Sequence, residues 1–505
     1  MIKELFKELT EIPSLKSPIG GTIKWLFVDL AMRKRVLVTV GAIIVLQFIA
    51  FIPLPGIDIS VLLQYFRRIS EAQSWPLIDT IQLFYNGALD RLKIFTLGLI
   101  PFFSACLLLQ FATVFVPKLR KFSFGGQAGR DKMVKLTYIF TIILCIIQAY
   151  FIALWLENPA RFEGMRLVVN PGLGFRLMVT FTITVSVLVL LFIADIINKH
   201  GIGNGVAIIA ISPLFIKFLQ AVNTIISLTQ SGKLQPGFFL LPAIIFVGLV
   251  YAIFYLTTRT KAIEINDGKN KTAINLRSGI VGLEPFGWGT GLVLFPLTIA
   301  SFTNSAWIQS LASLINRGTI LYTIISSVLI VVFTYLYALI VFDSKYLNGL
   351  VNKYGFSLAS INDKAPEDHL YNCMSKVLIV TAFVLLAVNI IPSLTMGFLK
   401  MPYWIASLFC GTTVLLGVGV FSDILHQAEF FKSRSDSGIK NWAICYTAFD
   451  EFEAKIKSEY LKSKGISALV EPLRFTWGMP IRTVVDQYRI YVSSDKREEA
   501  RNLIL

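Results

Sequence analysis

Long runs of apolar residues, separated by shorter polar stretches, follow one another along most of the chain. Each run contains about twenty residues, and a helix of that length spans a hydrocarbon core of roughly 30 Å. The pattern predicts ten membrane spans, at residues 36–53, 94–115, 136–156, 173–196, 205–228, 238–258, 279–302, 319–341, 375–397 and 402–423. The sequence therefore predicts an all-α polytopic membrane protein.

The basic residues indicate how these spans are oriented, because Lys and Arg are retained on the cytoplasmic side of a membrane. If the N-terminus lies inside, the inner segments hold about twice as many basic residues as the outer ones. We therefore expect both termini to be cytoplasmic. Two inner loops, 117–135 and 259–277, are polar, basic and contain Gly, so we expect them to project as arms that dock an acidic or RNA-bearing partner.

The composition supports a membrane protein, and this limits how the net positive charge can be interpreted. Of the 505 residues 55% are hydrophobic and 15% charged, and the mean hydropathy is +0.67, which excludes an ordinary soluble protein. Retention charge and contact with anionic lipid headgroups account for most of the net charge of +16 without nucleic acid. The five cysteines lack CxxC spacing, so neither a disulfide framework nor a zinc site is predicted.

A short internal repeat indicates two related halves. Gly98–Phe102 opens the second span and the similar stretch Gly282–Phe286 opens the seventh, five spans later. Since an odd number of spans separates them, the two halves are expected to run in opposite directions. The predicted organisation is a cytoplasmic amphipathic segment at 1–35, five-helix halves at 36–228 and 229–427, and a small soluble α+β domain at 440–505.

The last segment is predicted to be soluble because its composition changes after Asp423. Alternating apolar positions predict strands, and apolar positions three or four residues apart predict helices. The expected strands are 442–447, 466–470 and 487–492, and the expected helices are 450–462 and 495–504. We call this segment the tail domain.

The sequence contains no recognisable catalytic arrangement. The motifs HExxH, GxSxG and GxxxxGK[ST] are all missing, and Gly201–Gly205 does not have the spacing of a dinucleotide loop. Ionisable residues are scarce within the spans, and Asp195, Glu284 and Asp423 fall near span ends, where a charge is tolerated. We therefore expect neither an enzyme nor a cofactor, and any ATP hydrolysis must come from another protein.

Six segments, in the right order, resemble the SecY/Sec61 alpha family of protein-translocation channels. They are Ile52–Asp58, Gly87–Leu89 with Ile94–Gly98, Ser104–Gln110, Gly201–Gly205, Leu294–Ser301 and Gly411–Thr413. The resemblance implies an hourglass-shaped channel in the inner membrane of a bacterium, closed by an external plug and a narrow apolar ring. It also implies that unfolded secretory polypeptides with signal sequences cross it, and that transmembrane segments leave sideways into the lipid.

Residues at matching positions receive their roles from this resemblance. The apolar ring is expected at Leu99, Phe103, Val206, Ala210, Gly287 and Leu416. The plug is expected at 75–90, with Trp75, Leu77, Ile78, Ile81, Phe84, Tyr85, Gly87, Ala88 and Leu89. The lateral gate, between the second and seventh spans, is expected at Ser104, Gln110, Asn204, Thr290 and Phe295. Gln110, Asn204 and Thr290 match a polar cluster that holds the closed gate.

The resemblance also implies partners that drive transport, because the chain itself has no nucleotide site. SecE and SecG are the expected membrane companions. The SecA ATPase or a translating ribosome is expected to dock on Arg259, Lys261, Lys269, Lys271 and Lys364. Lys364 departs from the family, which usually has Arg there, and Lys lacks the planar fork of a guanidinium.

The ring also departs from the family pattern, because Ala210 and Gly287 are smaller than usual and Phe103 is larger. The alternative is a secondary transporter with inverted repeats and broken helices. Such a transporter should carry Asp, Glu or His near the membrane midplane, whereas a translocation channel does not need them.

Overall fold

The computed structural model describes most of the chain. The described residues are 29–62, 64–65, 93–124, 126–162, 164–231, 240–258, 260–266, 271–277, 285–290, 292–293, 307, 310, 314–315, 319–341, 344–358, 366–399, 412–439, 441–448, 451–473 and 487–504.

Among the described residues, nine long helices fall on nine of the ten predicted spans. They are α3 (Leu30–Ile49), α6 (Ile100–Phe115), α8 (Gly126–Glu157), α9 (Leu173–His200), α10 (Gly205–Gln230), α11 (Leu240–Thr258), α14 (Ile320–Val341), α16 (Pro366–Leu399) and α18 (Thr412–Asp436). Most of the seventh predicted span, 279–302, lies outside the described residues, although 285–290 are helical.

Several of these helices continue past the apolar window that predicted them. The helix α3 begins at Leu30 because the side chain of Asp29 caps it, accepting a hydrogen bond from the backbone N–H of Met32 at 3.3 Å. The helix α8 begins ten residues earlier than predicted, and α18 continues to Asp436. Hydropathy marks only the part of a helix that lies in lipid, so the polar extensions were not predicted.

Length and composition support a membrane location for the described helices. Four of them contain segments long and apolar enough to cross a membrane: Asp131–Glu157, Leu173–His200, Gly205–Thr224 and Thr413–Asp436. Shorter apolar helical segments fall on four further predicted spans, at Ile100–Leu109, Ile244–Phe254, Ile320–Leu336 and Leu378–Leu394.

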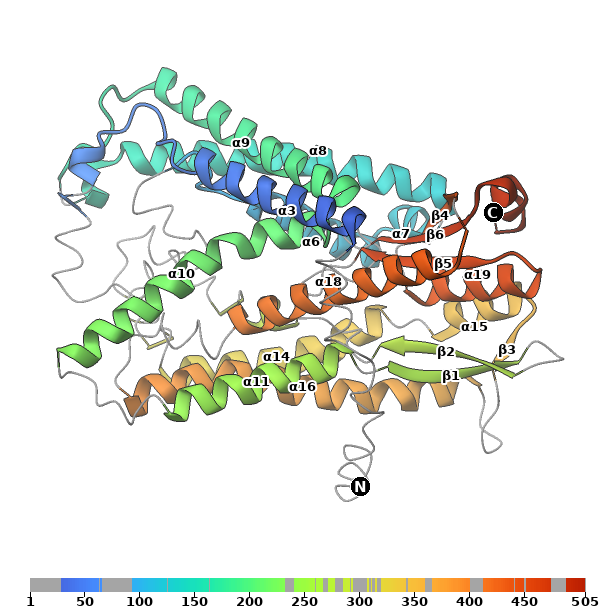
Figure 1. Cartoon of the computed structure of the whole chain (residues 1–505). Coiled ribbons are helices and arrows are strands. Elements are labelled where there is room, and N and C mark those ends of the chain that lie inside the picture. Colours follow the sequence, from blue (N-terminus) through green and yellow to red (C-terminus); the bar gives the residue numbers. More distant parts are fainter. Residues whose placement is uncertain are drawn as a thin grey trace.

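The helices lie side by side in one elongated bundle, with α8 and α9 along one side and α11, α14 and α16 along the other (Figure 1). Two hydrophobic clusters hold the bundle together. One joins α3, α6, α8, α9 and α10, and the other joins α11, α14 and α16. The helix α18 belongs to both, since Leu416 packs in the first cluster and Leu415 in the second. It is therefore the helix that connects the two sides.

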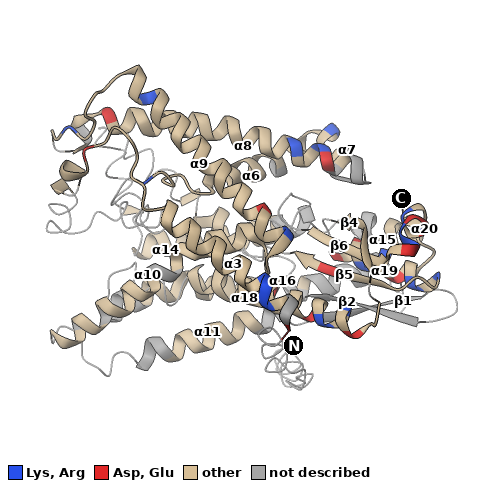
Figure 2. Ribbon diagram, turned by 45° about the horizontal axis from the view of Figure 1, so that its top comes forward, with Lys and Arg blue, Asp and Glu red and all other residues tan. Residues whose placement is uncertain are grey.

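The outer surface of the bundle is apolar, as lipid contact requires. Phe151 on α8 and Phe181 and Phe192 on α9 are largely exposed. Charged residues instead gather toward the ends of the bundle, above all at the end that carries α7 (Pro117–Phe124) and the tail domain (Figure 2). This division between apolar sides and charged ends fits a protein that crosses a bilayer.

The two basic loops contain regular structure that their composition did not predict. The first forms α7 and the beginning of α8. The second forms an antiparallel hairpin of β1 (Thr260–Asn266) and β2 (Lys271–Arg277). The short strand β3 (Ser357–Leu358), which follows α15 (Ser344–Lys353), extends this sheet by pairing with β1. The hairpin is therefore held at one edge by a segment about ninety residues further along the chain.

The tail domain is a three-stranded antiparallel sheet with helices on one face. Its elements are β4 (Trp442–Ala448), α19 (Glu451–Ser463), β5 (Ala468–Leu473), β6 (Gln487–Ser493), η4 (Ser494–Lys496) and α20 (Arg497–Ile504). The strand order is β4-β6-β5. Ile490 and Val492, two residues apart on β6, share the face that packs on α19 and α20. A mostly helical membrane protein with a small α+β tail domain confirms the predicted fold class.

Cys445 reports on the packing of the tail domain. Its thiol is buried and donates to the backbone carbonyl of Ile490, and burial raises its pKa to about 11 from the ordinary value of 9.0. At pH 8 this shift leaves on the order of 100-fold less thiolate than in the unfolded chain. We expect iodoacetamide to label Cys445 at least that much more slowly in the folded protein than in urea, as measured by mass spectrometry. Equal rates would show that the thiol is not buried.

Candidate functional site

Five of the six expected ring residues lie in one apolar cluster. Leu99 precedes α6, Val206 lies in the first turn of α10, and Leu416 lies on α18; all three are buried members of the cluster. Phe103 on α6 and Ala210 on α10 are partly buried and pack against it. These positions on or next to α6, α10 and α18 thus belong to the same apolar cluster, which also includes residues of α3, α8 and α9.

Close helix packing brings α10 and α18 together at this cluster. A methyl group added at Gly417, next to Leu416, would lie 3.7 Å from the Cδ1 atom of Ile211 on α10, which is ordinary van der Waals contact. The residues that follow the ring positions on the two helices are therefore neighbours.

The sixth expected ring residue, Gly287, differs from the others. It is exposed, and no atom of the described residues lies within 4 Å of where a Cβ atom would be. Its neighbours Phe286 and Thr290 are buried, and Phe286 packs in the second cluster, with α11, α14, α16 and α18. Gly287 therefore contributes no side chain to the apolar cluster.

The expected gate residues are only partly described. Ser104 lies half-buried on α6, and Gln110 lies on the same helix, although its side chain is outside the described set. Asn204 and Thr290 are both buried. The Thr290 hydroxyl donates to the backbone carbonyl of Phe286 at 2.8 Å, one turn earlier in its own helix. Phe295 lies outside the described residues, so the opposing side of the gate is not described.

The glycine-rich stretch Gly201–Gly205 forms the connection between α9 and α10; we call it the 201–205 loop. Asn204 is the N-cap of α10, and its Oδ1 atom accepts hydrogen bonds from the backbone N–H groups of Val206 at 3.0 Å and Ala207 at 3.3 Å. Capping of this kind fixes where a helix begins. Asn204 therefore sets the position of the turn that carries the ring residue Val206.

Two glycines in this loop are required by its geometry. Gly203 has φ +82°, in the left-handed region that side chains disfavour. At Gly205 a Cβ atom would lie 2.1 Å from the backbone oxygen of Ala194 on α9, so any side chain would push the two helices apart. The loop is thus a tight turn between closely packed helices, and its glycines are needed for the shape of the backbone.

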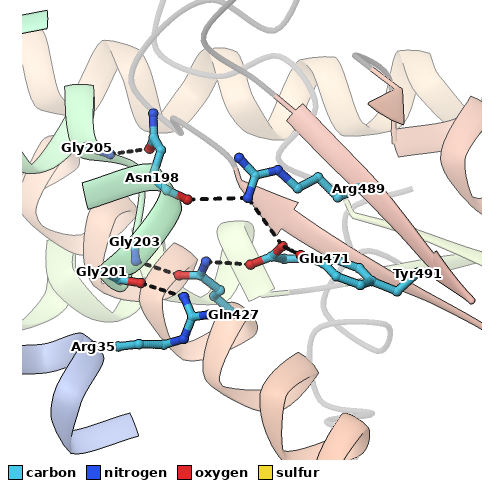
Figure 3. A network of polar contacts seen from close by, with 9 residues as sticks. All are labelled: Arg35, Asn198, Gly201, Gly203, Gly205, Gln427, Glu471, Arg489 and Tyr491. Atoms are coloured by element: carbon cyan, nitrogen blue, oxygen red, sulfur yellow. Dashed lines mark hydrogen bonds and ion pairs between the residues drawn. The ribbon is translucent and has the colours of Figure 1, made fainter. Parts of the chain in front are cut away.

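Side chains from three helices hold the backbone of the 201–205 loop (Figure 3). Arg35 donates to the carbonyl of Gly201 at 3.0 Å. The Thr39 hydroxyl both accepts from the N–H of Ile202 at 2.9 Å and donates to its carbonyl at 3.2 Å. Asn198 accepts from the N–H of Gly205 at 2.7 Å, and Gln427 accepts from the N–H of Gly203. Five backbone groups of the turn are therefore paired with side chains of α3, α9 and α18.

The sequence-based interpretation missed these supporting residues. Arg35 is one of many basic residues at the membrane ends, and Thr39, Asn198 and Gln427 belong to no recognisable motif. Their one sequence signal is a polar side chain near the end of an apolar helix, which many unrelated residues share. Only the tertiary structure distinguishes them.

Two groups of expected site residues lie largely outside the described part of the chain. The plug residues, 75–90, all do. Among the docking residues, Arg259, Lys269 and Lys364 also lie outside it. Lys261 lies on β1 and Lys271 on β2, so both belong to the hairpin that β3 supports.

Among the described residues, two acids lie near the apolar cluster: Asp423 on α18, which is buried, and Asp195 on α9. Asp195 on α9 forms an ion pair with Lys199, one turn later, at 2.6 Å, and both side chains are about half exposed. Within the described ranges, no three His, Cys, Asp or Glu side chains come together in a way that would hold a metal ion. The described part of the site is thus dominated by apolar contacts.

Comparisons with known proteins agree with this architecture. Residues 93–425 match the family model described as SecY. The protein translocase subunit SecY of Escherichia coli K12 is 27% identical over 426 residues, which cover 81% of this chain and 94% of that protein.

Two solved structures share the fold. The structure of a protein-conducting channel matches with a TM-score of 0.51 at 14% identity, and a SecY structure whose plug domain stabilises the closed channel matches with a TM-score of 0.50 at 16% identity. Each match covers 81% of this chain and 94% of the other. Because the family model matches well over half of the chain, the chain belongs to the SecY family.

Proposed function

We propose that this chain is the central protein-conducting subunit of a Sec translocon. It passes unfolded secretory polypeptides across a membrane and releases transmembrane segments sideways into the lipid. The observation that carries the proposal is that Leu99, Val206 and Leu416, which come from distant parts of the sequence, are all buried in one apolar cluster.

A constriction of this kind reconciles sealing with passage. A ring of apolar side chains expels water, so ions, which need a hydration shell, do not cross it at rest. An extended polypeptide needs no complete hydration shell, because its own atoms contact the apolar side chains of the ring as it pushes them aside. About nine extended residues span 30 Å, so only a short stretch of a client occupies the constriction at any time.

Sideways release would follow from partition energy. On insertion scales a Leu residue favours lipid by about 0.3–0.6 kcal/mol, so a client segment rich in Leu gains several kcal/mol by leaving the pore. We assign the gate to α6, with Ser104 and Gln110, and to the helix that contains Thr290. Hydrogen bonds between polar side chains inside a membrane contribute only about 0.6 kcal/mol each, which biases a gate without locking it.

We place the chain in the inner membrane of a bacterium with both termini in the cytoplasm, as the distribution of basic residues favours. SecE and SecG are its proposed membrane companions. The proposed docking surface for the SecA ATPase or the ribosome includes the β1–β2 hairpin with Lys261 and Lys271. The support that β3 gives to this hairpin favours the role, because a rigid platform loses less entropy on binding.

Depletion of the protein tests the function most directly. If the chain is the translocation channel, its removal from cells that depend on it leaves secretory precursors uncleaved in the cytoplasm, which pulse labelling and immunoprecipitation detect. Normal export combined with failed uptake of a single solute would instead identify a transporter.

The apolar cluster is tested by replacing Leu416 with Asn. An amide among apolar side chains loses about 1–3 kcal/mol unless it stays hydrated, so the seal should admit water and the resting ion leak should rise roughly tenfold or more. Clients with poor signal sequences should also pass more easily. The matched control is Leu415→Asn, since Leu415 is equally buried but packs in the other cluster. Equal leak in the two variants would contradict the ring assignment.

The docking surface is tested by reversing charge on the hairpin. In Lys261→Glu combined with Lys271→Glu, attraction to an acidic or RNA-bearing motor becomes repulsion, so motor-dependent transport into vesicles should fall severalfold while the resting leak stays normal. The control is Lys462→Glu with Lys464→Glu, which changes the charge equally at the end of α19. Loss of transport in both double variants to the same extent would indicate a general charge effect.

A further inference from the structure

The tail domain is packed against the membrane helices through the face of its sheet that does not contact α19 and α20. Trp442 and Tyr491 of the tail form a buried cluster with Phe430 and Phe431 of α18, Met32 of α3 and Ile202 of the 201–205 loop. Two arginines extend the contact: Arg35 lies 4.3 Å from the Phe431 ring, and Arg434 lies 5.2 Å from the Tyr491 ring. Aromatic packing and cation–π contacts thus fix the tail domain on the bundle.

A buried carboxylate lies within this contact. Glu471 on β5 is only 1% exposed, and its two oxygens have different partners (Figure 3). The Oε2 atom accepts a hydrogen bond from the Tyr491 hydroxyl at 2.8 Å and lies 3.7 Å from Arg489. The Oε1 atom accepts from the side-chain amide of Gln427 on α18 at 3.0 Å. Burial and the neighbouring Glu471 raise the pKa of Tyr491 to about 12, so its hydroxyl remains a donor.

The Glu471 carboxylate determines which way the Gln427 amide faces. A carboxylate only accepts hydrogen bonds, so Gln427 must turn its NH2 group toward it. The amide oxygen of Gln427 then faces the opposite way, where it accepts from the backbone N–H of Gly203. If the amide were reversed, its oxygen would face the Glu471 carboxylate, another acceptor. Its NH2 group would then face the N–H of Gly203, another donor. The charge on Glu471 therefore holds the 201–205 loop through one intervening side chain.

A second connection from the tail reaches the end of α9. Arg489 on β6, which lies beside Glu471, donates to the backbone carbonyl of Asn198 at 3.3 Å. Asn198 in turn accepts from the N–H of Gly205, the first residue of α10. The tail domain is therefore linked to two points of the 201–205 loop: to Gly203, at its middle, through Gln427, and to Gly205, at its end, through Asn198.

We propose that Glu471 is a positioning residue of the channel, and that through Gln427 it holds the 201–205 loop and hence the start of α10. This step rests on the proposed function, because α10 carries the ring residues Val206 and Ala210 in its first two turns. In this arrangement a soluble domain sets the rest position of the apolar constriction. Anything that moves the tail domain also shifts the ring.

The isosteric variant Glu471→Gln tests the proposal. It keeps the shape of the side chain but adds an amide donor, so that Gln427 no longer has one preferred orientation. We expect backbone amides of residues 202–208 to exchange hydrogen for deuterium at least about tenfold faster. The measurement uses the full-length chain in lipid nanodiscs and mass spectrometry of its peptides, and unchanged exchange in β4, β5 and β6 shows that the tail domain is intact.

The matched control is Glu453→Gln. Glu453 is also buried in the tail domain, but it binds Tyr446 at 2.8 Å and Lys457 at 3.1 Å within the tail itself. The same chemical change there should leave exchange at 202–208 unaltered. In the double variant Glu471→Gln with Gln427→Glu the carboxylate lies on α18, accepts from both neighbours, and should restore slow exchange.

The ion leak of the same proteins in planar bilayers shows whether the loop governs the constriction. We expect Glu471→Gln to raise the resting leak severalfold, and the reversed pair to return it to normal. Unaltered exchange at 202–208 in Glu471→Gln overturns the proposal. So does faster exchange in Glu471→Gln with a normal ion leak, provided that the Leu416→Asn variant does leak. If Leu416→Asn also fails to leak, the ring assignment is wrong, and the exchange result alone decides whether Glu471 holds the loop.

Discussion

The structure depends on one constraint: the chain must reverse direction in the 201–205 loop directly beside the apolar cluster, without leaving unpaired polar groups there. A backbone polar group that is buried away from water needs a partner within the protein, and residues 201–205 are all buried. The 201–205 loop meets this demand with Arg35, Thr39 and Gln427, which satisfy backbone groups between the ends of α9 and α10. With those groups satisfied, Val206 can lie in an apolar cluster one residue after the turn ends.

The position of α18 explains how the two sides of the bundle and the tail domain are linked. Leu415 and Leu416 pack into different clusters, so one helix belongs to both sides. Farther along the same helix, Gln427 contacts the loop and Glu471, and Phe430 and Phe431 contact the tail domain. In the proposed arrangement a displacement of the tail domain would be transmitted through α18, and the low exposure of Glu471 makes its contact with Gln427 costly to break.

Much of the fold was predictable because its signals are local. A run of apolar residues long enough to cross a bilayer predicts a helix wherever it occurs, and nine predicted spans correspond to described helices. The tail strands were predictable for the same reason, since alternation along β6 separates Ile490 and Val492 from Arg489 and Tyr491. The ends of α3 and α8 were not predictable, because their polar turns depend on capping and on neighbours outside the lipid.

The sequence by itself determined the membrane helices, the soluble tail and, by its motifs, the family. Only the tertiary structure decided which polar residues act together. Arg35 reaches Gly201 across 166 positions of the chain, Gln427 reaches Gly203 across 224, and Arg489 reaches Asn198 across 291. Hydropathy and motif spacing describe neighbours along the chain, whereas the orientation of the Gln427 amide depends on a carboxylate that folding brings to it. For that reason Glu471 has no distinguishing mark in the sequence, although it lies at the centre of the contact between the tail domain and the bundle.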